Sequence, residues 1–90
     1  MADYTSVIIT PEFMASFADK AFSPADRRRF LQALLLLDSN ERHPSLRVHQ
    51  LQGDQAGIWS ASASDELRLT FERLSEGKKL LLRCSHHYQR

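Results

Sequence analysis

The sequence predicts an α+β domain in which a helical hairpin packs on one face of a mostly antiparallel sheet. Three observations lead to this prediction. A β-branched segment opens the chain, two segments with helix-start signals follow, and after residue 43 the hydrophobic period changes from about 3.6 to about 2. Helices followed by a run of strands are typical of α+β domains. With 90 residues, the chain is expected to form one domain, residues 1–90, too small to enclose a large cofactor.

The first strand and the first helix are predicted next to each other. Residues 4–9 contain consecutive β-branched side chains, which favour a strand. Thr10 then supplies a hydroxyl cap and Pro11 the first helical position, so that a short helix is expected to start here. Phe13 and Phe17 are four residues apart and therefore share one face of that helix.

A second, longer helix is predicted from Pro24. Ser23 precedes it as the cap, and Asp26 stands at the third helical position, as in a capping box. Spacings of three and four between apolar residues then indicate an amphipathic helix of about four turns that ends around residues 38–40. The apolar residues that set this pattern are Phe30, Leu31, Leu34, Leu35 and Leu37.

The rest of the chain is predicted to be an antiparallel four-strand meander. Apolar and polar residues alternate in segments separated by turn-forming residues. The first strand of the chain is expected to insert beside one of these later strands. The predicted strands lie within residues 46–51, 58–63, 67–74 and 80–84, and the turns at 53–57, 64–65 and 75–78.

Charge and cysteine content limit the functional classes. The net charge is only +1, although residues 1–42 carry five basic against six acidic side chains and residues 43–90 seven against five. Cys84 is the only cysteine, so neither an intramolecular disulfide nor a thiolate metal cluster is expected. No segment resembles a signal peptide or a membrane span, and a cytoplasmic protein is expected. The run Arg27–Arg29 is interpreted as a solvated face, with a partner protein or nucleic acid as the alternatives.

Arg68 is the first candidate functional residue. In its strand, Leu67, Leu69 and Phe71 are expected to face the helices, which turns Arg68 and Thr70 toward the open face of the sheet. In a meander the strand that ends at residues 84–85 pairs with the Arg68 strand. The tail His86, His87 and Tyr88 is therefore expected within reach of Arg68.

This combination points to phosphodiester cleavage without a metal. A fixed cation, imidazoles and a phenol supply transition-state stabilisation and proton transfer. Adjacent histidines are poor chelators and no carboxylate-rich motif accompanies them, so that no metal and no cofactor are expected. Arg47 and His49 would add positive charge beside Arg68, whereas Trp59 is interpreted as a core residue.

From residue 43 to residue 88 the sequence resembles the RelE/ParE superfamily of bacterial toxins from toxin–antitoxin pairs. The residues that carry the resemblance are the segment 43–53, Trp59-Ser60 followed by Arg68 within residues 67–71, and the ending 84–88. The final His87-Tyr88 resembles the YoeB-type branch in particular.

The resemblance implies a microbial RNase-like fold and metal-independent cleavage of mRNA in the A site of the 30S ribosomal subunit. The ribose 2′-OH would attack the adjacent phosphate and give a 2′,3′-cyclic phosphate. Carried over by position, Arg68 stabilises the phosphate, His87 is the general acid and Tyr88 orients or stacks the substrate. His49 is the expected general base with Glu66 in reserve, and Glu41 lies nearby but out of register. We also expect RNA contacts from Arg47, Lys78, Lys79, Arg83 and His86.

The resemblance also implies a cognate antitoxin, with which the chain would form a hetero-oligomer, and no membrane partner. The antitoxin would lay an acidic or amphipathic segment over the helical hairpin and the positive sheet face. Two alternatives remain: a ParE-type inhibitor of DNA gyrase, and an inactive module that only binds antitoxin. Gyrase poisoning should survive replacement of His87, whereas RNA cleavage should not. Other branches carry a histidine where this chain has Ser62, which keeps the inactive module open.

Overall fold

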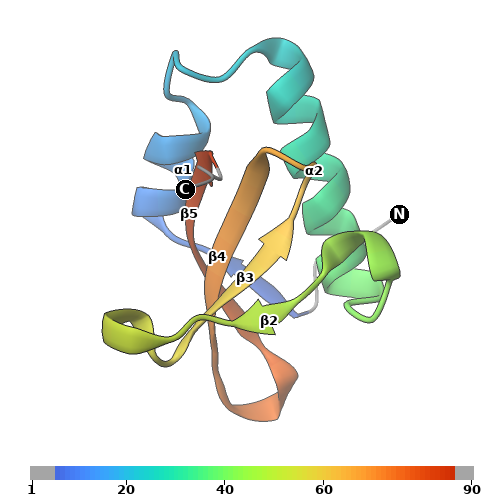
Figure 1. Ribbon diagram of the computed structural model, residues 1–90, viewed down its shortest axis with the longest axis vertical. Coiled ribbons are helices and arrows are strands. Elements are labelled where there is room, and N and C mark those ends of the chain that lie inside the picture. The colour runs from blue at the N-terminus through green and yellow to red at the C-terminus, as the bar shows by residue number, and fades with distance from the viewer. Residues whose placement is uncertain (1–5, 87–90) are drawn as a thin grey trace.

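The computed structural model describes residues 6–86 and has the predicted α+β architecture (Figure 1). Two helices lie on one side of a five-stranded sheet. The helices are α1 (Pro11–Phe17) and α2 (Pro24–Ser39), and three short 3₁₀ turns are η1 (Pro44–Leu46), η2 (Gly53–Gln55) and η3 (Ser75–Gly77). The strands are β1 (Val7–Ile9), β2 (His49–Gln50), β3 (Ile58–Ser62), β4 (Leu67–Arg73) and β5 (Lys79–His86).

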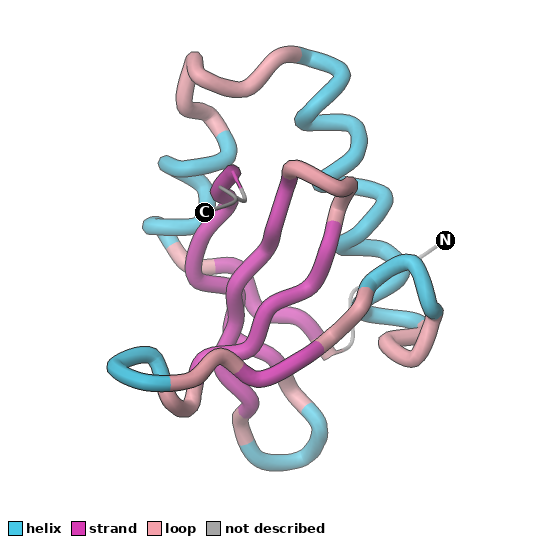
Figure 2. The backbone as a smooth tube through the Cα atoms, in the orientation of Figure 1, coloured by secondary structure: helices cyan, strands magenta, loops and turns pink. Residues whose placement is uncertain are grey.

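The strand order is β1-β5-β4-β3-β2. Strands β2 to β5 form an antiparallel meander, and β1 pairs in parallel with β5, which confirms that the first strand inserts beside a later one (Figure 2). The β3–β4 turn lies beside the helices, and the β4–β5 turn projects from the opposite end of the molecule (Figure 1). The start of β4 therefore lies near α2, and the end of β4 lies at the opposite end of the molecule.

Both helices start where the sequence predicts. The Phe13 N–H donates to Thr10 Oγ1 over 3.0 Å at the start of α1. At the start of α2, the Asp26 N–H donates to Ser23 Oγ and the Ser23 N–H donates to Asp26 Oδ2, each over 3.0 Å. This reciprocal pair is the predicted capping box.

Arg27 joins the two helices. Its guanidinium donates to the carbonyls of Phe17, the last residue of α1, and of Ala18 and Asp19, which follow it. Cations satisfy the free carbonyls at the C-terminal end of a helix in this way. Arg27 is thus a structural residue, whereas Arg28 and Arg29 are exposed.

The core fills the space between α2 and the inner face of the sheet. Alternation along β4 buries Leu67, Leu69 and Phe71 on this face, as predicted. Leu31 and Leu35, however, are 47% and 44% exposed, which corrects their assignment to the apolar face of α2. The buried residues of α2 are Phe30, Ala33, Leu34 and Leu37.

The predicted strand 46–51 is wrong in its first half. His43 Nδ1 accepts a hydrogen bond from the Ser45 N–H, and Pro44 starts η1, which places Leu46 in a 3₁₀ turn with its side chain fully buried. Arg47 then has a left-handed backbone with φ of 47°. A strand cannot run through such a conformation, so β2 has only two residues.

The outer edge of β5 is covered by α1 beyond the end of β1. Thr10 Oγ1 donates to the Leu81 carbonyl over 2.7 Å, and the Cys84 N–H donates to Ser16 Oγ over 2.8 Å. Burial raises the pKa of the Cys84 thiol to about 12, so this cysteine is an inert core residue. Within residues 6–86, no helix is long and apolar enough to cross a membrane.

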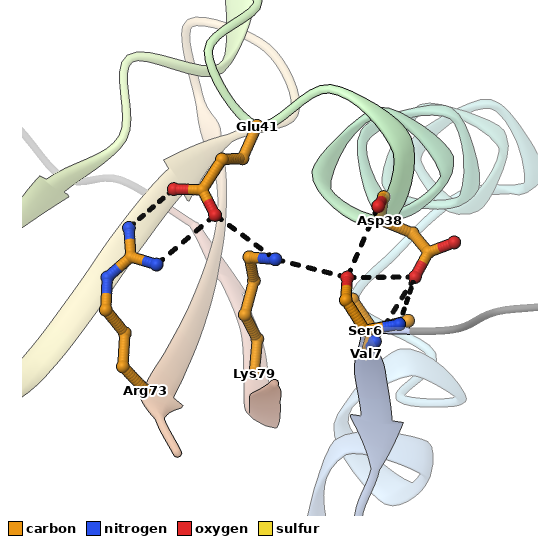
Figure 3. Close-up of polar contacts among 6 residues, drawn as sticks. All are labelled: Ser6, Val7, Asp38, Glu41, Arg73 and Lys79. Carbon is orange, nitrogen blue, oxygen red and sulfur yellow. Dashed lines mark hydrogen bonds and ion pairs between the residues drawn. The ribbon is translucent and has the colours of Figure 1, made fainter. Parts of the chain in front are cut away.

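An ion-pair network closes the end of the fold near the β4–β5 turn (Figure 3). Glu41 accepts two hydrogen bonds from Arg73, at 2.6 and 3.2 Å, and pairs with Lys79 at 3.1 Å. Lys79 Nζ also donates to Ser6 Oγ, and Ser6 is bound to Asp38 at the end of α2. The network therefore ties α2 and the segment after it to β1, β4 and β5.

Candidate functional site

A groove of about 410 Å³ lies on the open face of the sheet, the face turned away from the helices. The register of the strands explains which side chains lie on the open face, where the groove is. Ser62, Arg68 and Ser85 lie opposite one another on β3, β4 and β5, and His49, Ser60, Thr70 and Arg83 form the neighbouring row. Residues that lie opposite each other in a sheet share a face. The groove is lined by Leu51, Gln52, Gln55, Ser60, Arg68, Thr70, Ser85 and His86.

Arg68 is held at one end of this groove by its own hairpin. Its Nη1 donates to the carbonyls of Ser64 at 2.8 Å and Leu67 at 3.1 Å. Nε and Nη2 make no hydrogen bond to any of residues 6–86, so these two donors can bind two oxygens of one phosphate. Burial, and then the charge of Arg47, lower the pKa of Arg68, while Asp65 opposes this effect. An arginine remains a cation under such a shift.

One contact of His49 determines which tautomer its neutral ring adopts. Its Nδ1 lies 2.9 Å from the Arg47 carbonyl, which can only accept a hydrogen bond. The neutral ring therefore carries its proton on Nδ1 and keeps the lone pair on Nε2. His49 is exposed and lies opposite Ser60, in the row next to that of Arg68.

The predicted acid and stacking residue, His87 and Tyr88, lie outside the described residues. The last described residue, His86, pairs with Leu67 at the end of β5. Its ring stacks on the buried Phe22 with centroids 4.8 Å apart, and the residue also lines one end of the groove. The described part of β5 thus ends beside the Arg68 strand, with Ser85 opposite Arg68.

The predicted RNA contacts fall into two groups. Arg47 and Arg83 are exposed, with Arg47 paired to Asp65 at 3.9 Å and Arg83 lining a second cleft of about 550 Å³ that shares Thr70 and Ser85 with the groove. Lys78 instead stands at the β4–β5 turn, far from Arg68 along β4. The assignment of Lys79 is corrected, because this side chain is 5% exposed and ion-paired with Glu41.

The two alternative general bases, Glu66 and Glu41, lie in different parts of the structure. Glu66 is exposed in the β3–β4 turn, where its N–H donates to Ser64 Oγ. Glu41 is excluded because it is bound to Arg73 and Lys79, and Arg73 lies roughly 17 Å along β4 from Arg68. Hydrogen bonds from Arg73 lower the pKa of Glu41 from 4.5 to about 2, with Lys79 adding to this effect and burial opposing it. Such a carboxylate is a poor proton acceptor.

Trp59 packs against the core as predicted, half buried, with the Arg73 guanidinium 4.3 Å from its ring centre.

Within residues 6–86, no group of three or more His, Cys, Asp or Glu side chains is arranged to hold a metal ion. Two features of the site were not predicted from the sequence: the Ser64 carbonyl that accepts from Arg68, and the presence of Gln52 and Gln55 in the groove wall. Alternation along β5 would have indicated Ser85, but no local pattern indicates how the η2 loop folds over the sheet.

Solved structures that share this fold include toxins and toxin–antitoxin complexes. A YoeB/ParE toxin from Agrobacterium tumefaciens has a TM-score of 0.71 at 17% identity, over 93% of this chain and all of its own. The toxin–antitoxin complex DinJ–YafQ from Escherichia coli contains a chain with a TM-score of 0.69 at 18% identity, over 94% of each chain. The RelBE2 toxin–antitoxin complex from Mycobacterium tuberculosis contains a chain with a TM-score of 0.61 at 22% identity, over 91% of this chain and 96% of its own.

No protein-family model matches the sequence, and no curated protein matches it significantly. At these identities, the similarity establishes that the chain has the fold of RelE/YoeB-like toxins.

Proposed function

We propose that this protein is the toxin of a type II toxin–antitoxin pair and that it cleaves mRNA in the ribosomal A site. The observation that carries the proposal is Arg68, a cation held at one end of an open-face groove, with two donors that no residue from 6 to 86 binds. On the open face of the sheet, Arg68 lies in the row of side chains next to the row that contains His49. Arg68 also lies opposite Ser85 near the end of β5, and His87 is the next residue of the sequence after β5. The shared fold with RelE/YoeB-like toxins supports the same conclusion.

The proposed reaction is an internal transesterification. His49 Nε2 takes the proton of the ribose 2′-OH, and the 2′ oxygen forms a bond to phosphorus. The bond from phosphorus to the 5′ oxygen breaks, and His87 supplies the proton to that leaving oxygen, with Tyr88 orienting the substrate. Arg68 binds the phosphoryl oxygens, whose negative charge increases in the transition state. The products are a 2′,3′-cyclic phosphate and a 5′-OH.

An antitoxin partner belongs to the same proposal. The solved complexes YoeB–YefM from Staphylococcus aureus and DinJ–YafQ from Escherichia coli pair chains of this fold with a second protein. We infer that a cognate antitoxin covers this chain as well and forms a hetero-oligomer with it. Co-expression with the neighbouring open reading frame should yield a co-purifying complex, and failure to co-purify would count against the partner.

Induction in cells tests the activity. Wild-type, Arg68→Ala and Arg68→Lys chains are induced, and primer extension maps cuts in a translated reporter mRNA. We expect cuts at A-site codons, reduced roughly a hundredfold or more in Arg68→Ala and partly retained in Arg68→Lys. Arg28→Ala removes an exposed arginine of α2 and serves as the matched control.

Because Arg68 also bonds the hairpin carbonyls, urea denaturation of each variant must show that the fold is retained. Growth arrest without mRNA cuts would contradict the proposal and favour gyrase inhibition. The absence of both effects would favour an inactive antitoxin-binding module.

A further inference from the structure

A third cleft, of about 340 Å³, lies between α2 and the free edge of β3. Strand β2 pairs only with Trp59 and Ser60. Among residues 6–86, β3 therefore has no strand neighbour on that side beyond Ser60, and η1 and α2 face it instead. Figure 1 shows this end of β3 beside α2. We call this space the β3-edge cleft.

The lining of the β3-edge cleft suits a planar, polar-edged ring. Leu36 is half-buried and contributes apolar surface, above Ala33 and Leu46, which are buried beneath the cleft. Three polar side chains also line the cleft. Arg29 donates hydrogen bonds, the Gln32 amide both donates and accepts them, and the Asp65 carboxylate accepts them. Apolar surface with a few convergent polar groups is typical of ligand sites, and guanidinium planes also stack on nucleobases.

The β3-edge cleft adjoins the cation of the proposed reaction. Ser62 lines the cleft and lies opposite Arg68 in the sheet. Ser64 also lines it, and its carbonyl accepts the hydrogen bond from Arg68 Nη1 at 2.8 Å. Arg47 lines the cleft on the η1 side. The cleft and Arg68 are thus connected through Ser62 and Ser64.

We propose that the β3-edge cleft binds the base of a nucleotide next to the cleaved phosphate and thereby determines which mRNA sequences are cut. The inference rests on the proposed function because it takes RNA as the substrate. Arg29 and Arg47 line the cleft and Arg68 lines the groove, against one lining carboxylate, Asp65, which is paired with Arg47. This excess of cations favours an anionic ligand. Arg29 is then a specificity-determining residue.

The direct test is nucleotide binding followed by NMR. The full-length ¹⁵N-labelled chain is titrated with each of the four ribonucleoside 3′-monophosphates. We expect saturable shifts of the Gln32 and Ala63 amides, with one base bound at least about threefold more tightly than the weakest. Arg29→Ala should weaken that preferred binding about threefold or more, whereas Arg28→Ala should leave it unchanged.

Other results would overturn the proposal. These are the absence of saturable shifts, shifts confined to Thr70 and Ser85 in the groove, or equal affinities in Arg29→Ala and Arg28→Ala. Shifts of the cleft amides on addition of the antitoxin, with none on addition of nucleotides, would assign the cleft to the protein partner and also overturn it.

Primer extension separates this inference from the proposed function. If the β3-edge cleft selects a base, Arg29→Ala should broaden the set of cleaved codons while the cuts still depend on Arg68. Base-selective binding in a chain that never cuts mRNA in cells would refute the proposed RNase and leave the cleft standing. Cleavage with the same codon pattern in Arg29→Ala and Arg28→Ala would refute the cleft and leave the RNase standing.

Discussion

Lys79 is 4% exposed, and the carboxylate of Glu41 allows its ammonium group to be buried. Glu41 also binds Arg73, so one acid compensates two cations at the point where β4 and β5 meet the end of α2. Removal of one partner from such a network leaves a charge that is desolvated and unpaired.

We therefore predict that Glu41→Gln lowers the free energy of unfolding by about 2 kcal/mol at neutral pH. The folded pKa is about 2 and the ordinary value is 4.5, so the unfolded chain takes up the proton first as the pH falls. This stabilisation is complete above the ordinary pKa and is lost as the pH falls from there toward the folded pKa.

Urea denaturation of both chains across that pH range measures the effect. The two stabilities should converge at acid pH. Glu72→Gln, an exposed acid on β4, is the control and should change stability by less than about 0.5 kcal/mol. An equal loss in both variants at neutral pH would contradict the role of Glu41.

The tautomer of His49 makes a second residue-scale prediction. An asparagine can keep the hydrogen bond to the Arg47 carbonyl from the Nδ1 position but has no basic Nε2. His49→Asn should therefore lower the single-turnover rate of mRNA cleavage on ribosomes about a hundredfold or more. His43→Asn, at the cap of η1, should retain near-normal cleavage. A wild-type rate in His49→Asn would transfer the base role to another group, with Glu66 the next candidate.

At the scale of elements, the start of α2 depends on its capping box. Ser23→Ala removes the hydroxyl that accepts from the Asp26 N–H, and should cost about 1 kcal/mol of folding free energy. Ser39→Ala is the matched control, since the Ser39 hydroxyl only donates back to the Leu35 carbonyl in the last turn. Urea denaturation midpoints should fall for Ser23→Ala and stay nearly constant for Ser39→Ala. The opposite order would mean that α2 is not stabilised at its start.

The same local signals explain which elements could be predicted. Thr10 and Ser23 cap helices through contacts three residues away, and β4 shows its faces by alternation, so these elements are readable from the sequence. The region around Arg47 was mistaken for a strand because alternation there hides a 3₁₀ turn. Lys79 looks like a surface cation in a hairpin, and only the tertiary approach of Glu41 buries it.

For the candidate site, the alternation of apolar and polar residues along β4 was sufficient to predict that Arg68 and Thr70 share the open face of the sheet. The β3-edge cleft was not predictable, because it exists only where β2 ends early and α2 passes β3.

At the scale of the whole molecule, a net charge of +1 gives little general attraction to RNA. The cations near the groove, Arg47, Arg68 and Arg83, are few, so the proposed reaction depends on the ribosome for much of the positioning of the substrate. We predict little cleavage of naked mRNA at physiological salt and efficient cleavage of the same mRNA on programmed ribosomes. Gel analysis of the two reactions at matched enzyme concentration measures this difference. Efficient digestion of naked RNA would contradict it.

The most direct test of the central claim is the chemical identity of the cut end. Purified wild-type protein is added to ribosomes programmed with a short synthetic mRNA, and the 5′ fragment is analysed by mass spectrometry, with Arg68→Ala as the control. The proposed reaction predicts a fragment one water lighter than the 3′-phosphate, which is the 2′,3′-cyclic phosphate, and no such fragment from Arg68→Ala. A fragment that ends in a 3′-OH, or an equal yield from Arg68→Ala, would contradict it.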